Sequence, residues 1–498
     1  MNAWTLRLRA LLLVTTFSAP LGAAAADAPP ELVAWIESTV PARMADAKLP
    51  GLSIAVVKDG QTIYAEGFGS RDPRRNLPAT PDTLYGIGSI TKSFVALGIL
   101  QLADAGKLRL DDPVSRHVPF ELGLPDKPIT IHHLLTHSLG IPSLASSSVA
   151  LYRGLGLETG VPLGSAADFY LFVNGARDEV VAPPGERFFY HNAAWRILGH
   201  IIQVRSGMPL HRYLKTHVID ALGMARTTLE VAAFSADADH IVPHRKDADG
   251  QPVPTAFPYP DPEDNPEFAF LSAAGGVLSS ASEMTHYLNA LLAQGRRPGG
   301  RLVGEESFER MQTLHIRQTD GHYGLRGYGY GLTVTPDFLG HTLLSHGGSI
   351  LVSTAYMALV PDVQAGVIIL GNGPGMSYGP LAEGVLAILM GHDPQQAVPV
   401  LRISEALKQL TGRYETYQGL AQTQVVLKAG LLHLRTTNPL TGVTSATPLI
   451  PVDDGLRRTD FYTWRNGLRS PIEFRVRDDG RVDLIVGRYR YRKVAPGS

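Results

Sequence analysis

Apolar residues near both ends of the first 390 positions follow patterns typical of β-strands. Residues 52–58 and 61–67 are joined by Asp59-Gly60, a dipeptide typical of two-residue hairpin turns. We expect these two segments to be edge strands of a sheet. Residues 354–360 and 366–370 flank Pro361-Asp362 and predict a second hairpin.

Helical spacing of apolar residues dominates the region between the two hairpins. One predicted helix ends near Gly106 and carries its apolar residues at Phe94, Val95, Leu97, Leu100 and Leu102. Another precedes Gly207 and carries Trp195, Leu198, Ile201, Ile202 and Val204. A closing helix is predicted over 381–390. Strands that bracket a helical middle predict an α+β domain, with an antiparallel sheet flanked by helices and a helical lobe.

The pattern changes after about Asp393, where brief alternating segments are separated by Gly, Asn and Asp turns. We therefore divide the chain into residues 1–26, a main domain over 27–395 and a C-terminal all-β domain over 396–498. The last of these is predicted to be a small antiparallel barrel. It carries 16 Lys and Arg residues and nine Asp and Glu residues. The role of this domain is open. It could cover a cleft, dimerise, bind an anionic surface or simply stabilise the chain.

Composition narrows the class of partner. The chain has 498 residues, of which 44% are apolar and 18% charged, and a net charge of −1. This is ordinary for a soluble globular protein. Nucleic-acid binding requires a clear excess of Lys and Arg, which the whole chain lacks. A small molecule or a short peptide is the expected partner.

The N-terminus has the order of a secretory signal peptide. Arg7 and Arg9 precede an apolar run over 10–17 and then Ala23-Ala24-Ala25-Ala26. Cleavage after Ala26 is expected, with an uncleaved membrane anchor as the alternative. No later segment is long and apolar enough to form a stable membrane span. The absence of cysteine excludes disulfides, a thiol nucleophile and a cysteine-ligated zinc. We expect a periplasmic or secreted protein, with its oligomeric state open.

Candidate chemistry begins with Ser89 and Lys92, which are three residues apart at the start of a predicted helix. That spacing places both side chains on one face, where the helix dipole favours negative charge. A serine hydroxyl needs a base to become a nucleophile, and a desolvated lysine can serve as one. The alternative is a helix start with a solvated lysine.

Two further strings supply complementary groups. Tyr190-His191-Asn192 follows a Pro- and Gly-containing loop. Tyr190 could take a proton from serine if a cation lowered its pKa, and the Asn192 amide could bind a substrate amide. Alternatively, Tyr190 packs in the core and Asn192 caps the next helix. His346-Gly347-Gly348-Ser349 lies at a strand edge, where two glycines allow close approach of a ligand and the Ser349 N–H could donate to an oxyanion.

Taken together, the order Ser-x-x-Lys, Tyr-x-Asn and His-x-Gly resembles the serine β-lactamase and penicillin-binding-protein superfamily. The similar branch contains class C β-lactamases, D-Ala-D-Ala carboxypeptidases, D-aminopeptidases and family VIII-type esterases. The likeness extends over about Leu32 to Gly391 and includes Leu134-Leu135-Thr136-His137-Ser138-Leu139-Gly140. The C-terminal segment resembles the lipocalin-like domain attached to some members of this branch.

The resemblance implies a role for each residue. Ser89 would be acylated, and Lys92 and Tyr190 would share the proton transfers. Asn192 would hold the acyl-side amide, and the N–H groups of Ser89 and Ser349 would bind the oxyanion. His346 stands where many relatives have lysine and would contact a substrate carboxylate or the Tyr190 hydroxyl.

The histidine at position 346 favours peptidase or esterase activity over strong β-lactamase activity, because a histidine is largely neutral at pH 7. We therefore expect a serine hydrolase without cofactor or metal that acts on amides or esters of small peptides, plausibly containing D-amino acids. The alternatives are carboxylesterase or β-lactamase activity, and a binding protein that senses penicillin or peptidoglycan fragments without turnover. A rival zinc site would need His133 and His137 four residues apart on one helix.

Overall fold

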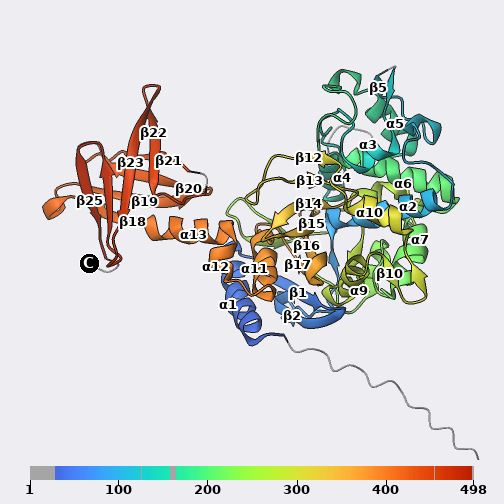
Figure 1. Ribbon diagram of the computed structural model, residues 1–498, viewed down its shortest axis with the longest axis horizontal. Coiled ribbons are helices and arrows are strands. Elements are labelled where there is room, and N and C mark those ends of the chain that lie inside the picture. Colours follow the sequence, from blue (N-terminus) through green and yellow to red (C-terminus); the bar gives the residue numbers. More distant parts are fainter. Residues whose placement is uncertain (1–27, 125, 158–163, 454, 496–498) are drawn as a thin grey trace, which may run out of the picture.

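The computed structural model describes residues 28–124, 126–157, 164–453 and 455–495. The predicted signal peptide, residues 1–26, lies outside the described residues. A nine-stranded antiparallel sheet forms the centre of the larger domain (Figure 1). Along the sheet the strands are β12 (Ile316–Arg317), β13 (Gly327–Tyr328), β14 (Thr333–Phe338), β15 (His341–Ser349), β16 (Thr354–Val360), β17 (Ala365–Gly371), β1 (Gly51–Lys58), β2 (Gln61–Asp72) and β3 (Leu77–Pro78). The sheet and the helices around it confirm the predicted α+β class.

Both predicted hairpins are present. Asp59 and Gly60 form the β1–β2 turn with φ of 50° and 79°, the left-handed conformation that such a turn requires. The expectation that both strands are edge strands was wrong. Strand β1 pairs with β2 on one side and with β17 on the other, and β2 also pairs with the two-residue β3, which forms this edge of the sheet. The side chains of β1 explain its position, because Ile54 packs into the apolar cluster on one face of the sheet and Val57 into the cluster on the other.

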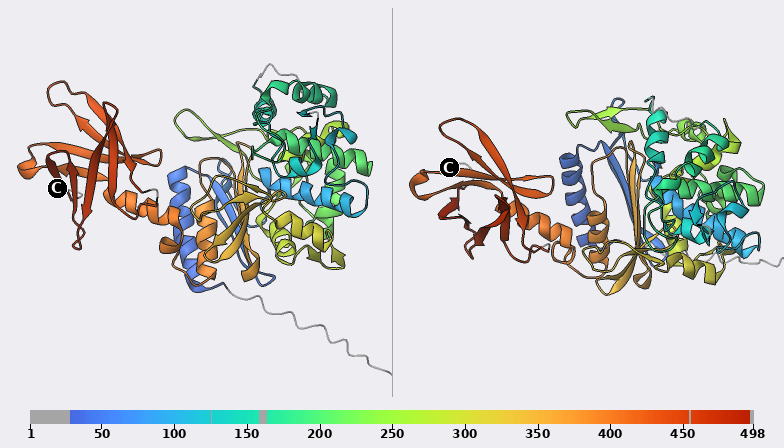
Figure 2. Two further views of the ribbon diagram at one scale, coloured as in Figure 1. Left: turned by 45° about the horizontal axis from the view of Figure 1, so that its top comes forward. Right: turned by 90° about the horizontal axis from the view of Figure 1, so that it is seen from above.

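Helices cover the two faces of the sheet differently (Figure 2). On the face nearer the C-terminal domain lie α1 (Pro30–Ala47) and α11 (Gly379–Leu389). In α1, Leu32, Ile36 and Val40 recur at i+4 and are fully buried, which fixes the face that the helix presents to the sheet.

The helical lobe lies on the other face of the sheet. Its two central helices are α2 (Thr91–Asp104) and α6 (Asn192–Ser206), which confirm the predicted pair and end before Gly106 and at Gly207, both in the left-handed conformation. Around them lie α3 (Ile131–Leu135), α4 (Ser146–Gly154), α5 (Ala166–Asn174), α7 (Leu210–Leu214), α8 (Val231–Ala236), α9 (Ala281–Leu292) and α10 (Glu305–Gln312). Several short strand pairs connect these helices, among them β4 (Tyr85–Gly86) with β9 (Leu278–Ser279).

The C-terminal domain is a closed antiparallel barrel, which confirms the predicted all-β architecture. Its strands are β18 (Gly412–Glu415), β19 (Gln422–Lys428), β20 (Leu431–Thr437), β21 (Thr444–Pro451), β22 (Asp460–Arg465), β23 (Leu468–Val476), β24 (Val482–Val486) and β25 (Tyr489–Lys493). Between the domains lie α12 (Pro394–Ala397) and α13 (Pro399–Leu410). Leu401 of α13 packs with Ala387 of the main domain, whereas Leu407 and Leu410 pack into the barrel core.

Within the described part of the chain, every helix is too short or too polar to cross a lipid bilayer.

Candidate active site

Ser89 lies in a single 3-10 turn, Gly88–Ile90, that leads into α2, and its side chain is partly exposed. Strand β15 passes directly beside this turn. A Cβ atom at Gly348 would lie 1.9 Å from the Ile87 carbonyl oxygen and 3.2 Å from the Ser89 nitrogen, and one at Gly88 would lie 2.5 Å from the Ser349 nitrogen. Because residues 88 and 348 are glycines, β15 can lie against the turn, which brings the main-chain nitrogens of Ser89 and Ser349 to the same side of the contact. This arrangement is compatible with an oxyanion hole built from their N–H groups.

Lys92 contacts the serine from the first turn of α2. Its Nζ donates hydrogen bonds to Ser89 Oγ at 2.9 Å and to the Ala274 carbonyl oxygen at 2.8 Å. The side chain is fully buried, and both acceptors are uncharged. Burial lowers the pKa of Lys92 well below its usual value, and the nearby positive charge of Arg196 lowers it further. These effects favour a neutral amine, which has a lone pair available for the serine proton.

Tyr190 approaches Ser89 from the loop before α6. Its ring centroid lies 4.9 Å from Lys92 Nζ. Burial raises the pKa of the Tyr190 hydroxyl, and a hydrogen bond with Ser89 only partly opposes that rise. The sequence-based idea that a cation turns Tyr190 into the base is therefore not supported. A protonated Tyr190 is suited to donate a proton instead.

Asn192 is the first residue of α6, with a partly exposed side chain. It is not the helix cap that the alternative interpretation assigned to it. The cap is His191, whose Nδ1 accepts a hydrogen bond from the Ala194 N–H at 3.2 Å. The Asn192 side chain, two residues after Tyr190, therefore does not serve as the cap of α6.

His346 is held differently from the sequence-based expectation. Its Nδ1 donates to the Gly347 carbonyl oxygen at 2.6 Å, and its Nε2 accepts from the Tyr328 hydroxyl at 2.8 Å. Burial lowers the pKa of His346 to about 3, and the positive charges of Lys92 and Arg326 contribute to the lowering. With a neutral ring and both nitrogens engaged, His346 is not arranged as a cationic anchor for a carboxylate. Its hydrogen bond goes to Tyr328 and not to Tyr190.

His137 supports the tyrosine loop, a role that sequence reasoning missed. Its ring centroid lies 4.2 Å from that of Tyr190. The main-chain N–H of His191 donates to Nδ1 at 2.8 Å, and the Trp195 indole points its N–H at Nε2 at 3.0 Å. Protonation would place positive N–H groups against these donors, and burial lowers the pKa of His137 well below its usual value. The string around His137 was visible in the sequence, but its partners were not.

The conformation of residues 133–137 does not fit the zinc site considered as an alternative. Helix α3 ends at Leu135, so His137 lies beyond it in a left-handed conformation with φ of 58°. His133 is on the helix and accepts the Thr130 N–H through Nδ1 at 3.1 Å. The rings of His133 and His137 therefore do not lie one turn apart on the same face of a helix, as the zinc site would require.

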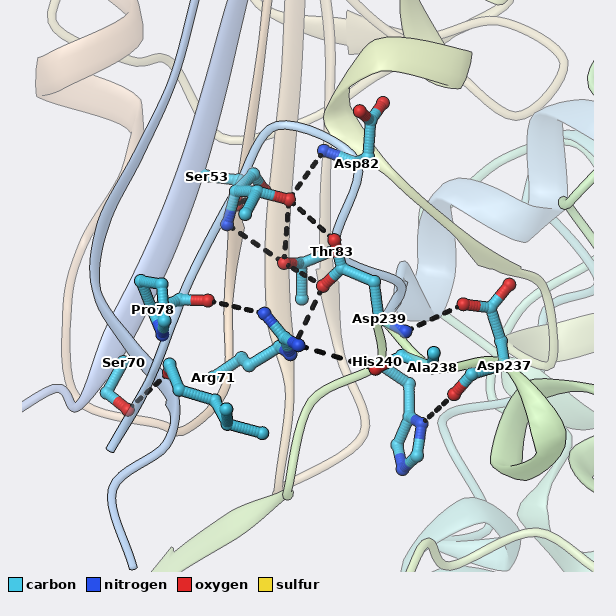
Figure 3. A network of polar contacts seen from close by, with 12 residues as sticks. Ser53, Ser70, Arg71, Pro78, Asp82, Thr83, Asp237, Ala238, Asp239 and His240 are labelled. Carbon is cyan, nitrogen blue, oxygen red and sulfur yellow. Dashed lines mark hydrogen bonds and ion pairs between the residues drawn. The ribbon is translucent and has the colours of Figure 1, made fainter. Parts of the chain in front are cut away.

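A polar network fixes the segment that leads into Ser89 (Figure 3). Asp239 accepts hydrogen bonds from the hydroxyls of Thr80, at 2.7 Å, and Thr83, at 2.6 Å, and its carboxylate lies 3.3 Å from Arg71 Nε. The Asp239 carbonyl oxygen accepts from the Leu84 N–H, next to β4. These contacts tie residues 80–84 to a distant loop and so set the path of the chain toward Ser89.

Comparisons with known proteins identify the class of protein to which this chain belongs. Residues 36–389 match the Beta-lactamase family, and residues 394–492 match the Pab87 octamerisation domain. The first match covers more than half of the chain, so the chain belongs to the beta-lactamase family. The hydrogen bond between Lys92 and Ser89 joins the first and last residues of the Ser-x-x-Lys string.

Particular relatives differ in how much they share. Protein flp of Staphylococcus aureus (strain MW2) is 28% identical over 328 residues, 65% of this chain and 60% of that protein. The chain thus spans about three fifths of the length of this relative. Esterase EstB of Burkholderia gladioli is 31% identical over 288 residues, 53% of this chain and 70% of EstB. The structure of the octameric penicillin-binding protein homologue from Pyrococcus abyssi matches 93% of this chain and 100% of its own, with a TM-score of 0.84 and 36% identity.

Proposed function

We propose that this protein is a serine hydrolase that forms an acyl-enzyme at Ser89. The observation that carries the proposal is the buried Lys92 amine 2.9 Å from Ser89 Oγ, held by uncharged acceptors. A lysine in this environment loses its proton more easily than one in water, so it can act as a base at neutral pH. Family membership supports the same activity.

The reaction uses groups that already surround the serine. Lys92 takes the Oγ proton as Oγ bonds to the substrate carbonyl carbon, and the N–H groups of Ser89 and Ser349 hold the resulting oxyanion. Collapse of the tetrahedral species breaks the bond to the leaving group, which receives the Tyr190 proton. The Lys92 ammonium, whose Nζ lies beside the Tyr190 ring, restores that proton. Water then attacks the acyl-enzyme with the same groups and releases the acid.

The proposed substrates are amides or esters of small, peptide-like molecules, including those that contain D-amino acids. The names of two relatives, an esterase and a penicillin-binding protein homologue, support this range. The neutral, fully engaged His346 argues against a lysine-like anchor and so favours peptidase or esterase activity over strong β-lactamase activity.

Intact-mass spectrometry of wild type and Ser89→Ala tests the mechanism, after brief exposure to a fluorophosphonate, penicillin, a D-Ala-D-Ala peptide and a p-nitrophenyl ester. We expect a mass adduct that requires Ser89, and product from one substrate class. Ser38→Ala is the matched control, because Ser38 is exposed on α1, on the far face of the sheet. The absence of an adduct in both wild type and Ser89→Ala would contradict the nucleophilic role of Ser89. Stable adducts without product would instead indicate a sensor.

We also propose that the chain is exported after cleavage behind Ala26, because residues 1–26 have the charge and apolar order of a signal peptide. N-terminal sequencing of protein recovered from the periplasm of a Gram-negative host tests this. The expected first residue is Asp27, and a protein that retains residues 1–26 would contradict it.

Assembly into an octamer is a further proposal. Its support is the match of residues 394–492 to the Pab87 octamerisation domain and the octameric P. abyssi homologue. The barrel exposes apolar side chains that an interface could cover, with Leu420 86% and Leu440 93% exposed. Native mass spectrometry of the full chain is expected to give eight copies, and the double variant Leu420→Glu, Leu440→Glu a smaller assembly. Leu171→Glu, which alters a leucine of α5 that is 75% exposed, is the control.

A further inference from the structure

A cavity of about 920 Å³ lies between the end of α1 and the β3 edge of the sheet. Its walls come from the residues just after α1, from β2 and β3, and from the hairpin of β7 (His244–Lys246) and β8 (Pro252–Pro254). None of the residues that we place around Ser89 belongs to this lining. The volume is within the range of small-molecule sites, so the cavity is a candidate for a second ligand.

The charged side chains of the lining are cations. Lys48 and Arg74 are exposed, and among the described residues no carboxylate lies at ion-pair distance from either of them. The lining contains no Asp or Glu. Nearby Asp72 is buried, and its Oδ1 accepts the main-chain N–H of Arg74 at 3.1 Å. The carbonyl end of α1 would repel an anion, but Lys246 donates to the Ala47 carbonyl oxygen there at 2.8 Å. The balance of charge favours an anionic ligand.

More than half of the remaining lining is apolar. It includes one leucine and five prolines, whose rings are rigid and carry no N–H: Leu49, Pro50, Pro73, Pro78, Pro252 and Pro254. The buried imidazole of His244 is also part of the wall. Burial lowers the pKa of His244 below its usual value, so the ring is neutral at pH 7 and adds no charge. Two cations beside a broad apolar surface match a molecule that has a carboxylate at one end and an apolar body.

One wall of the cavity is connected to the segment that leads into Ser89. The carbonyl oxygen of Pro78 accepts a hydrogen bond from the Arg71 guanidinium at 2.8 Å, and this guanidinium lies 3.3 Å from the Asp239 carboxylate (Figure 3). Asp239 in turn holds residues 80–84, which set the path of the chain toward Ser89. A ligand packed on Pro78 therefore touches the first residue of this chain of contacts.

The opposite wall is connected to the strand end beside the same serine. The His244 N–H donates to the Val352 carbonyl oxygen at 3.3 Å, three residues after Ser349. The next residue, Ser353, donates from its hydroxyl to the Gly86 carbonyl oxygen at 2.9 Å. The two walls thus reach the two segments whose N–H groups would bind the oxyanion.

We propose that this cavity is a second ligand site, which binds a small organic carboxylate through Arg74 and Lys48 and packs its apolar body on the prolines. A molecule that bridges the two walls also holds the segments on both sides of Ser89 in place, and such preorganisation of the oxyanion donors favours acylation. The binding itself is independent of the proposed hydrolase function, whereas its effect on acylation rests on that function.

A matched pair of probes isolates the charge. We would titrate the full chain with 2-naphthoate and with 2-naphthamide, which have the same ring system and differ in charge, and measure Kd by ligand-observed NMR. Wild type is expected to bind the carboxylate about fivefold more tightly, the scale of two solvent-exposed ion pairs. The preference is expected to shrink in 0.5 M NaCl, because salt screens exposed charges.

The double variant Lys48→Asn, Arg74→Gln is expected to bind both probes with the Kd that wild type has for the amide. Asparagine is chosen at position 48 because the residue there is left-handed, with φ of 51°. An unchanged Kd for the amide shows that the variant is folded. Arg75→Gln is the matched control, since Arg75 is the exposed neighbour of Arg74 and does not line the cavity. It is expected to keep the full preference for the carboxylate.

The effect on Ser89 is measured by single-turnover acylation with a p-nitrophenyl ester. Saturating 2-naphthoate is expected to raise the wild-type rate about fivefold, at the lower end of measured couplings between sites, and to leave the double variant unchanged.

Equal Kd values for the two probes in wild type, or a preference that the double variant retains in full, would overturn the site. A wild-type rate that 2-naphthoate leaves unchanged or lowers would overturn the connection to Ser89. Failure of the ester to acylate wild type without any probe would instead refute the hydrolase function and the connection with it, while the two Kd values would still decide whether the cavity binds carboxylates.

Discussion

Lys92 Nζ donates a hydrogen bond to the Ala274 carbonyl oxygen at 2.8 Å, so the amine beside the candidate nucleophile is held by a neutral partner. A carboxylate in that position would stabilise the ammonium and raise the pKa of Lys92. A carbonyl oxygen can accept a hydrogen bond from an ammonium or from a neutral amine, and it favours the ammonium less than a carboxylate does. It therefore fixes the position of Nζ without fixing its charge.

Replacement of Lys92 by arginine is expected to abolish rapid acylation. A guanidinium keeps its proton at every pH that a folded protein tolerates, so it cannot accept the Ser89 proton. We expect the single-turnover acylation rate with a p-nitrophenyl ester to fall by at least about 100-fold, within the range attributed to general-base catalysis. Lys107→Arg is the control, since Lys107 is exposed just beyond the far end of α2. Equal rates in the Lys92 variant and wild type would contradict the base assignment.

The pH dependence of acylation follows from the lowered pKa of Lys92. Only the neutral amine can take the serine proton, so the rate rises as the pH rises through that pKa and is then constant. Because burial and Arg196 lower the pKa well below 10.5, we expect the rise to be complete well before pH 10. Stopped-flow acylation between pH 5 and 9 measures the profile. A rate that is still increasing with a full unit slope at pH 9 would show that the amine is not perturbed.

The local part of the site was predictable from the sequence because it depends on neighbours in the chain. Ser89 and Lys92 are three residues apart at a helix start, so spacing alone places their side chains together. The Lys92 partner Ala274 is 182 positions away and contributes only a main-chain oxygen, which no side-chain pattern reveals. Trp195 is likewise 58 positions from His137.

The same distinction applies to the fold. Strand alternation revealed β16 and β17, but which strand lies beside β1 depends on long-range pairing that short sequence patterns do not encode. In the barrel, simple alternation does not mark β21, because Pro448 and Pro451 interrupt its pattern. It does not mark β22 either, because Phe461, Tyr462 and Trp464 place aromatic residues on both faces. His346 was named as a candidate from the sequence, but its hydrogen bond with Tyr328 was not visible there, because Tyr328 contacts it from another strand.

Acid is expected to destabilise the protein through its buried histidines. The folded-state pKa of His346 is about 3, below the unfolded value near 6.5, so the unfolded chain binds the extra proton as the pH falls below about 6.5. The contribution of His346 to the free energy of unfolding is at its maximum above about pH 6.5 and decreases toward pH 3. The loss between pH 7 and pH 5 is about 2 kcal/mol for His346 alone. His191, with a pKa lowered to about 4, acts in the same direction.

Urea unfolding at pH 7 and pH 5 measures this loss. His346→Gln cannot bind the proton in either state, so its pH-dependent loss is expected to be smaller than that of wild type by about 2 kcal/mol, whatever its stability at pH 7. His433→Gln, which alters a partly exposed barrel histidine, is the control and is expected to keep the wild-type difference. An unchanged difference in His346→Gln would show that His346 is not held neutral in the folded protein.

Removal of the Asp239 carboxylate is expected to loosen the segment before Ser89 (Figure 3). In Asp239→Ala, Thr80 and Thr83 lose their shared acceptor and the partly buried Arg71 loses its ion-pair partner. Unpaired, partly buried polar groups of this kind cost about 2–3 kcal/mol in total. Differential scanning calorimetry is expected to show a lower Tm, and the acylation rate is expected to fall because residues 80–84 set the path into the nucleophile turn.

Asp59→Asn is the matched control, since it removes the charge of the exposed Lys58–Asp59 pair in the β1–β2 turn and keeps a residue type that tolerates the left-handed conformation there. Such a pair contributes about 0–1 kcal/mol, so Tm and acylation rate are expected to stay close to wild type. If both aspartate variants lowered Tm equally while acylation was unaffected, the network around Asp239 would have no special part in positioning Ser89. A loss of acylation in Asp239→Ala alone would show that the ion pair and the two threonine hydroxyls hold the nucleophile turn in place.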